Sequence, residues 1–125
     1  MKRFLLPIAL ILFISFSKSD FILPSEKEEK ENQKTERTNF VVKGICKMCK
    51  KRIEKATLSI KGVKMATWDI PSNMIDIIYD AKKIDLQDIH KKITSVGHDT
   101  DKVKASDDVY DSLPMCCQYR TEPIH

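Results

Sequence analysis

The sequence lacks a strong excess of charge of either sign. It contains 22 Lys and Arg residues against 18 Asp and Glu residues, a formal net charge of +4 at pH 7. Aromatic residues make up only 7% of the chain, and they are not interleaved with the basic ones. Domains that bind nucleic acids combine a basic surface with aromatic residues that stack on bases, so this composition argues against a nucleic-acid partner.

The sequence also lacks an apolar run long enough to cross a bilayer comfortably. The longest run, Phe4–Phe16, has thirteen residues, whereas a membrane-spanning helix needs about 20. A positive start at Lys2 and Arg3 precedes this run, and small residues follow it. This pattern predicts a secretory signal peptide over residues 1–19, with an uncleaved membrane anchor as the alternative. We therefore expect an exported protein, with the bacterial periplasm as its compartment.

The next segment, residues 20–38, has few residues that could form a core. About half of its residues are charged, and the two signs nearly cancel. Such a composition buries too little apolar surface to offset the entropy that is lost on ordering. It predicts a flexible linker, followed by a folded domain over residues 39–105 and a C-terminal extension over residues 106–125.

Six segments with strand or helix patterns follow one another in this domain. Strands are predicted where β-branched and apolar residues concentrate between turn residues, at residues 39–45, 63–70, 74–79 and 100–105. Helices are predicted where apolar residues recur at helical spacing, over residues 48–61 and 85–97. The order β-α-β-β-α-β is that of the α+β ferredoxin-like sandwich, in which two helices cover one face of a four-stranded antiparallel sheet.

Two of the four cysteines form a Cys-x-x-Cys motif at Cys46 and Cys49, between the first strand and the first helix. Such a pair can be a redox dithiol, half of a zinc site, a two-thiolate metal site or a disulfide. Structural Zn(II) needs four ligands, whereas two thiolates suit softer ions of low coordination number, Cu(I) or Hg(II). We expect the helix dipole and the surrounding basic residues to lower the pKa of the thiols: Lys43, Lys47, Lys50, Lys51 and Arg52.

Over residues 39–105 the sequence resembles the heavy-metal-associated domain family. The resemblance is carried by Gly44, Cys46 and Cys49, by the helix sequence CKKRIEKATLSIKGV and by the segment ITSVGHDT. That family includes small copper chaperones, N-terminal domains of copper-transporting ATPases and periplasmic mercuric-ion-binding proteins, and an exported single-domain chain most resembles the last group. The resemblance implies a ferredoxin-like fold, a metal ion held by Cys46 and Cys49, and His98 close to that ion.

The motif departs from the family pattern, which commonly reads Gly-Met-Thr-Cys-x-x-Cys. Here Gly44, Ile45 and Cys46 follow one another, so the loop is one residue shorter and lacks the methionine. Ile45 is expected to fill the apolar space that the methionine normally occupies.

A second group of soft donors, Met115, Cys116 and Cys117, stands in the C-terminal extension, which the resemblance does not explain. Adjacent cysteines rarely bond to each other without strain, because disulfide geometry places the two Cα atoms about 4.4–6.8 Å apart. Three interpretations stay open: a second soft-metal site, a disulfide to Cys46 or Cys49, and thiols that pack beneath a docked tail.

These observations predict an exported protein that binds a soft metal ion, Cu(I) before Hg(II), and passes it by thiolate exchange to a metal transporter or another metallochaperone. The basic residues around the motif predict an acidic docking surface on that partner. No catalytic nucleophile, acid or base is identifiable in the sequence, so no enzymatic activity is expected. The alternatives are an exported thiol–disulfide redox protein that uses the same cysteine pair and an interaction domain stapled by disulfides. His90 is expected at the surface of the second helix.

Overall fold

The computed structural model describes residues 34–121, so the predicted signal peptide and most of the predicted linker lie outside the described residues. The elements follow in the order β1 (Thr35–Val41), α1 (Lys47–Leu58), β2 (Val63–Trp68), β3 (Met74–Asp80), α2 (Leu86–Ser95), α3 (Asp107–Asp111) and the 3-10 turn η1 (Met115–Cys117).

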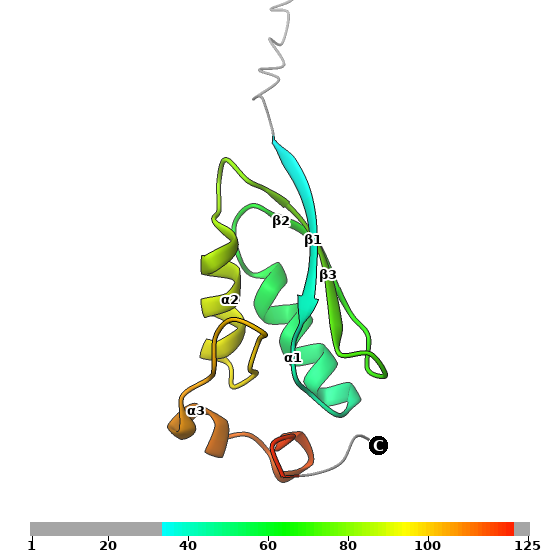
Figure 1. The fold of residues 1–125 in the computed structure, drawn as a ribbon, viewed down its shortest axis with the longest axis vertical. Coiled ribbons are helices and arrows are strands. Elements are labelled where there is room, and N and C mark those ends of the chain that lie inside the picture. The colour runs from blue at the N-terminus through cyan, green and yellow to red at the C-terminus, as the bar shows by residue number, and fades with distance from the viewer. Residues whose placement is uncertain (1–33, 122–125) are drawn as a thin grey trace, which may run out of the picture.

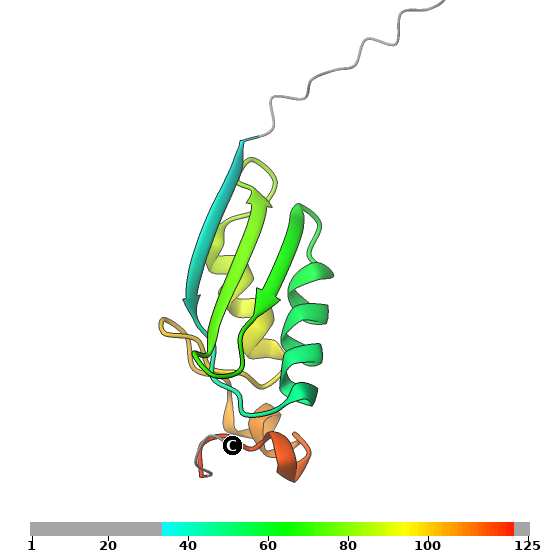
Figure 2. The same ribbon diagram turned by 90° about the vertical axis from the view of Figure 1, so that its right-hand side faces the viewer.

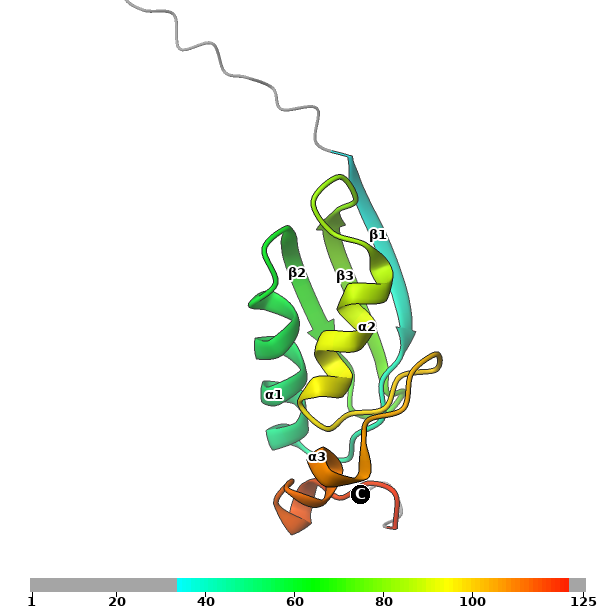
Figure 3. The same ribbon diagram turned by 90° about the vertical axis from the view of Figure 1, so that its left-hand side faces the viewer.

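The three strands form one antiparallel sheet in the order β1-β3-β2. In the register, Phe40 on β1 and Trp68 on β2 both pair with Ile75 on the central strand β3. Helices α1 and α2 lie side by side on one face of this sheet, as Figures 1 and 3 show. The ferredoxin-like arrangement predicted from the sequence is therefore confirmed, with three strands in the described part of the chain.

The core lies between the sheet and the two helices. Helix α1 turns Cys49, Ile53 and Ala56 inward, at the spacing of one helical face. Trp68 is fully buried, and its indole N–H donates to the carbonyl oxygens of Val42 and Asn73 at 2.9 and 3.2 Å. This side chain therefore links the sheet to the loop that precedes α1.

Strand β1 begins at Thr35, four residues before the predicted strand. Residues 35–38 were assigned to the linker because of their polar and charged composition, and this assignment is wrong for these four residues. They form an edge strand with alternating exposure, whose Arg37 contacts Asp76 on β3. Charged side chains are compatible with an edge strand because they point to solvent while the backbone pairs with β3.

The fourth strand predicted at residues 100–105 is reduced to a single bridge between Val42 and Thr100. The hydroxyl of Thr100 accepts from the backbone N–H of Val103 at 3.0 Å, and its own N–H donates to the Val103 carbonyl at 2.8 Å. These bonds close a turn that leads the chain away from β1. The segment therefore cannot continue a ladder beside the sheet.

His90, expected at the surface, is buried instead. Its ring stacks on Phe40 with centroids 4.0 Å apart, and its Nδ1 lies 2.7 Å from the Thr100 hydroxyl. The histidine thus fastens α2 both to β1 and to the turn that replaces the fourth strand.

After this turn the chain folds beneath the domain. Helix α3 and the turn η1 lie at the end where β1 passes into α1, as Figures 1 and 2 show. None of the described helices is long and apolar enough to span a membrane.

Candidate metal-binding site

The Cys-x-x-Cys motif stands at the N-terminus of α1. Cys46 is the N-cap residue with an extended backbone, and Cys49 lies in the first turn of the helix. The two sulfur atoms are 3.5 Å apart. Cys49 is fully buried and Cys46 is half-buried, so solvent and ligands reach the pair from the side of Cys46.

Gly44 allows the loop to approach the helix closely. A Cβ atom at this position would lie 2.9 Å from the Trp68 ring and 3.0 Å from Cys49 Cβ, which is closer than real side chains pack. The glycine of the motif is therefore required by the space between Trp68 and Cys49. Ile45, which follows it, is buried in the core, as expected.

The tail brings the other two cysteines to the same place. Cys117 Sγ lies 3.8 Å from Cys46 Sγ and 3.9 Å from Cys116 Sγ. The ligand atoms of Cys46, Cys116 and Cys117 all lie within 4.8 Å of one another. The four cysteines, which we call the thiol cluster, are all free thiols in this structure. The predicted ligand Cys46 and the two tail cysteines thus form one three-thiol group, and Cys49 is joined to this group through its contact with Cys46.

The methionine that contacts the cluster is Met48. Its thioether sulfur lies 3.6 Å from Cys116 Sγ, and the side chain is 49% exposed. The sequence had indicated Met115 instead, but that side chain is 86% exposed. Met48 is one of the two residues between the motif cysteines. The soft thioether sulfur at this position was the sequence feature that could have identified it as a neighbour of the cluster.

The two motif thiols differ in acidity. Partial burial disfavours the Cys46 thiolate, but hydrogen bonding from the Cys49 backbone N–H, the Cys49 thiol and the Cys117 thiol lowers the pKa of Cys46 below its ordinary value. Burial raises the pKa of Cys49 to about 12. Cys46 is therefore the thiol that loses its proton first, and Cys49 requires a bound cation to ionise near neutral pH.

The expectation that the surrounding basic residues lower the pKa of both thiols is wrong for Cys49, and none of these residues is among the causes of the shift at Cys46 or Cys49. The ammonium group of Lys50 lies 2.5 Å from Glu54 and donates to the carbonyl of Trp68 at 2.6 Å. Its hydrogen bonds therefore connect α1 to the last residue of β2 and are not directed at the thiols. Helix α1 has no acidic residue in its first turn. Because the N-terminus of a helix is electropositive, thiolates of Cys46 and Cys49 would be the anions that complement it.

His98 is fully buried at the end of α2. Its Nδ1 lies 2.8 Å from the Lys43 carbonyl, which can only accept, so Nδ1 carries the proton and Nε2 has the lone pair. Burial lowers the pKa of His98 to about 4, and the charge of Arg52 acts in the same direction. Nε2 has no hydrogen-bond partner among the described residues. The structure does not place His98 in the group formed by Cys46, Cys116 and Cys117.

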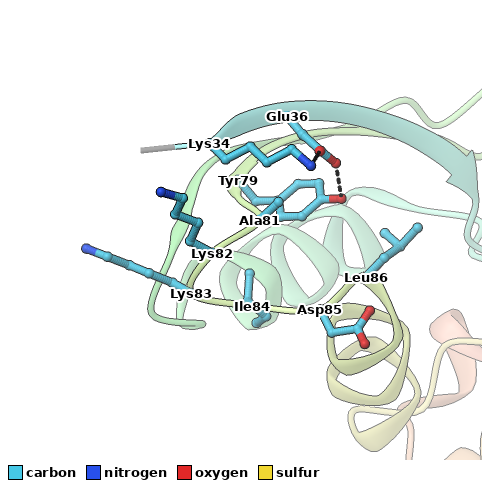
Figure 4. A pocket seen from close by; sticks show the side chains of 9 residues that line it. All are labelled: Lys34, Glu36, Tyr79, Ala81, Lys82, Lys83, Ile84, Asp85 and Leu86. Carbon is cyan, nitrogen blue, oxygen red and sulfur yellow. Dashed lines mark hydrogen bonds and ion pairs between the residues drawn. The ribbon is translucent and has the colours of Figure 1, made fainter. Parts of the chain in front are cut away.

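The opposite end of the domain carries a separate cavity of about 410 Å³. Lys34, Glu36 and Tyr79 line one side of it and the segment from Ala81 to Leu86 lines the other, as Figure 4 shows. Glu36 bridges Lys34 and the Tyr79 hydroxyl at 3.0 and 3.2 Å. This polar hollow contains no sulfur ligand, so the soft-donor chemistry of the described residues is concentrated at the thiol cluster.

The heavy-metal-associated domain family matches residues 40–99. This range includes Cys46, Cys49 and His98, whereas the segment that carries Cys116 and Cys117 lies beyond it. Among curated proteins, no sequence matches the chain.

Three solved structures illustrate the similarity, each with a TM-score of 0.51. A CopZ metallochaperone is 26% identical, over 52% of this chain and 98% of its own. The N-terminal domain of a potential copper-translocating P-type ATPase from Bacillus subtilis, solved in the Cu(I)-loaded state, is 27% identical over 53% of this chain and 84% of its own. Oxidised MerP from Ralstonia metallidurans CH34 is 21% identical over 53% of this chain and 93% of its own, which shows the shared fold.

Proposed function

Because residues 40–99 form a heavy-metal-associated domain, we propose that this protein binds Cu(I) through the thiolates of Cys46 and Cys49 and passes the ion to a metal transporter or another metallochaperone. The family and its structural neighbours support a metal-binding, chaperone-like role in general terms. The observation that carries the specific proposal is the 3.5 Å contact of the two sulfur atoms at the N-terminus of α1.

Soft thiolate sulfur prefers Cu(I), with Hg(II) as the ion of comparable softness. Binding displaces the protons that the two thiols still carry, and the high pKa of Cys49 makes this displacement pH-dependent. Transfer then proceeds by ligand exchange: a partner thiolate bonds to the ion while one bond to Cys46 or Cys49 breaks. The oxidation states of the metal and the sulfur atoms do not change, and the exchange needs no catalytic acid or base.

Metal titration of the reduced protein tests the proposal. We expect tight binding of Cu(I), measured in competition with a chromophoric chelator, and loss of that binding in Cys46→Ser. Hg(II) titrated under the same conditions ranks the two ions. Cys46→Ser that binds Cu(I) as tightly as the wild type would exclude the motif as the site.

The N-terminal sequence supports a proposal about location. We propose export to the bacterial periplasm through the apolar segment Phe4–Phe16 and its positive start. Mass spectrometry of the protein from a periplasmic extract should give an N-terminus close to residue 20. An intact Met1 on a protein found in the cytoplasmic fraction would refute this proposal.

A thiol–disulfide redox protein is the second candidate, and the unequal acidity of Cys46 and Cys49 is the observation that favours it. A half-exposed thiol of lowered pKa beside a buried thiol is the arrangement that disulfide exchange uses. This candidate predicts an oxidising reduction potential for the Cys46–Cys49 pair and no tight metal binding by the reduced protein. The Cu(I) titration above therefore discriminates between the two functions.

A further inference from the structure

The C-terminal tail is held against the domain by a buried polar network. The Tyr119 hydroxyl donates to the Gly97 carbonyl at 2.7 Å and accepts from the Asp99 N–H at 2.8 Å. Arg120 binds both carboxylate oxygens of Asp99, at 2.9 and 3.2 Å, and donates to the Ala105 carbonyl at 2.8 Å. A bidentate pair of this kind fixes orientation as well as position.

Apolar contacts complete the docking. Leu113 packs against Gly97, where any added Cβ would lie 3.0 Å from the leucine side chain. Tyr119 stacks on His98 with centroids 5.4 Å apart and meets the Tyr110 ring edge-on at 5.1 Å. The tail is thus built to lie in this place, and Cys116 and Cys117 precede its anchor residues directly.

The docked tail completes a linear series of five sulfur atoms, each in contact with the next. Cys49 contacts Cys46 at 3.5 Å, Cys46 contacts Cys117 at 3.8 Å, Cys117 contacts Cys116 at 3.9 Å, and Cys116 contacts Met48 at 3.6 Å. Cys46 belongs both to the motif pair and to the three-thiol group with the tail cysteines. The motif pair and the three-thiol group therefore share the ligand Cys46 and are not two separate sites.

These separations match those of sulfur ligands around one ion. A metal–sulfur distance of about 2.3 Å in a tetrahedral site places neighbouring sulfur atoms about 3.8 Å apart. Sulfur atoms on opposite sides of a two-coordinate ion would lie farther apart, by about twice the metal–sulfur distance, or ~4.6 Å. The contacts of Cys46 with Cys49 and Cys117, at 3.5 and 3.8 Å, fit the closed arrangement better. Cys49 lies outside the three-thiol group of Cys46, Cys116 and Cys117, so a site with all four thiolates requires Cys49 Sγ to move toward the tail sulfur atoms.

We propose that Cys116 and Cys117 bind the same metal ion as Cys46 and Cys49, so that the tail turns an open two-thiolate site into a closed site of three or four thiolates. This inference rests on the proposed metal binding by the motif. The buried Cys117 is the third ligand, and the exposed Cys116 is the fourth. The tail occupies the place through which a partner thiolate would reach the ion, so release requires a tail thiolate to leave first.

Titration with Cd(II) counts the thiolates around the ion. In the reduced, purified full chain we expect one Cd(II) per protein, with thiolate-to-metal charge-transfer absorbance about twice that of the Cys116→Ser/Cys117→Ser double variant. The affinity for Cd(II) should fall by about 100-fold or more in the double variant, since two ligands are lost. For Cu(I), X-ray absorption should give at least three sulfur neighbours in the wild type and two in the double variant.

Variants separate this inference from the proposed function. Met115→Ser lies in the same tail but outside the cluster, and it should leave the absorbance and the affinity unchanged. Circular dichroism of the metal-free variants checks that the domain is folded, and the single variant Cys116→Ser changes only an exposed thiol. Cys46→Ser tests the proposed function itself, because it removes the ligand that the motif pair and the three-thiol group share, and it should lower the affinity more than either tail variant does.

Three results would overturn the inference. Equal thiolate counts and equal affinities in the wild type and the double variant would show that the tail is not a ligand. A fall from two bound ions to one, with the spectrum of the other ion unchanged, would show an independent second site. Failure of the reduced wild type to bind any soft ion would refute the proposed function, and the inference with it.

Discussion

The two cysteine pairs of the thiol cluster are positioned by different means: the motif pair is Cys46 and Cys49, and the tail pair is Cys116 and Cys117. Cys46 and Cys49 are three residues apart, and the first turn of α1 alone brings their sulfur atoms to 3.5 Å. Cys117 is 71 residues from Cys46 along the chain, and only the docking of the tail brings the two sulfur atoms to 3.8 Å. One pair depends on a local element and the other on long-range contacts.

This difference means that the two pairs can be lost separately. The motif pair should persist whenever the sheet and α1 are folded. The tail pair needs, in addition, the network around Tyr119 and Arg120, whose bonds must offset the entropy of ordering the segment. A tail that undocks would restore the open two-thiolate site, so closure of the proposed site is reversible.

The largest effect is expected from Trp68→Ala, which removes support from both pairs. Loss of this fully buried side chain should reduce the free energy of unfolding by about 3–5 kcal/mol, because it leaves a cavity and frees the carbonyl of Val42. Urea unfolding followed by circular dichroism measures the change. Leu58→Ala, at a half-exposed position on α1, is the control and should cost much less. A loss below about 1 kcal/mol in Trp68→Ala would contradict the role of this core.

Acidification should lower the free energy of unfolding of the metal-free protein through His98. The pKa of this histidine is about 4 in the folded protein and about 6.5 in the unfolded chain, so the unfolded chain takes up the proton first as the pH falls. The contribution of neutral His98 to the free energy of unfolding is fully present above pH 6.5. It is lost as the pH falls from about 6.5 to 4, by about 3 kcal/mol in the metal-free protein.

Urea unfolding of the metal-free protein across this range tests the prediction. His98→Gln should reduce the pH dependence, since the amide can keep a donor for the Lys43 carbonyl but does not titrate. The dependence that remains is assigned to buried His90, whose pKa burial also lowers. The lowered pKa of Asp99 adds a further loss only below its ordinary range, so it does not account for the window above pH 4. A wild type whose stability is constant between pH 6.5 and 4 would show that His98 is not buried as described.

The sequence was most informative where structure is local. It predicted the motif, the helices that became α1 and α2 and the strands that became β2 and β3, because periodicity acts over a few residues. It failed at residues 35–38, where an exposed edge strand has the composition of a linker. It also failed at Thr100, whose side-chain bonds close a turn where a strand was expected.

The tail could not be predicted in the same way. Tyr119 and Arg120 look like ordinary residues of a polar C-terminus, and their roles depend on Gly97 and Asp99 in the folded domain. The soft donors in the tail were evident from the sequence. Their contact with the motif cysteines was not, because no local rule relates positions that lie 71 residues apart.

Arg120→Ala should separate the tail from the domain at intermediate cost. Removing the guanidinium leaves the largely buried Asp99 carboxylate without its cation, which should cost about 2 kcal/mol of docking free energy. Cys117 should then react faster with a thiol reagent, while Cys49 stays protected inside the folded domain. Peptide mapping after partial labelling measures the two rates.

Arg37→Ala is the matched control, since Arg37 also pairs with an aspartate, Asp76, but at the exposed face of β1. Exposed pairs contribute about 0.2–1 kcal/mol, so this variant should leave the labelling of both cysteines unchanged. If Arg120→Ala and Arg37→Ala expose Cys117 equally, the network around Arg120 is not what docks the tail.

The smallest effect is expected at the two methionines near the cluster. Met48→Leu removes a thioether that lies 3.6 Å from Cys116 Sγ, whereas Met115→Leu changes a side chain that is 86% exposed. Leucine is close to methionine in size, so the comparison isolates the sulfur. Because a thioether is a weak, soft donor, Met48→Leu should lower the affinity for Cu(I) by a few-fold, about 0.5–1 kcal/mol, and Met115→Leu should leave it unchanged.

Competition titration with a chromophoric Cu(I) chelator resolves this difference, and the same titration with Cd(II), a harder ion, should show a smaller change in Met48→Leu. Equal effects of Met48→Leu and Met115→Leu would contradict the assignment of Met48 as the methionine that supports the site.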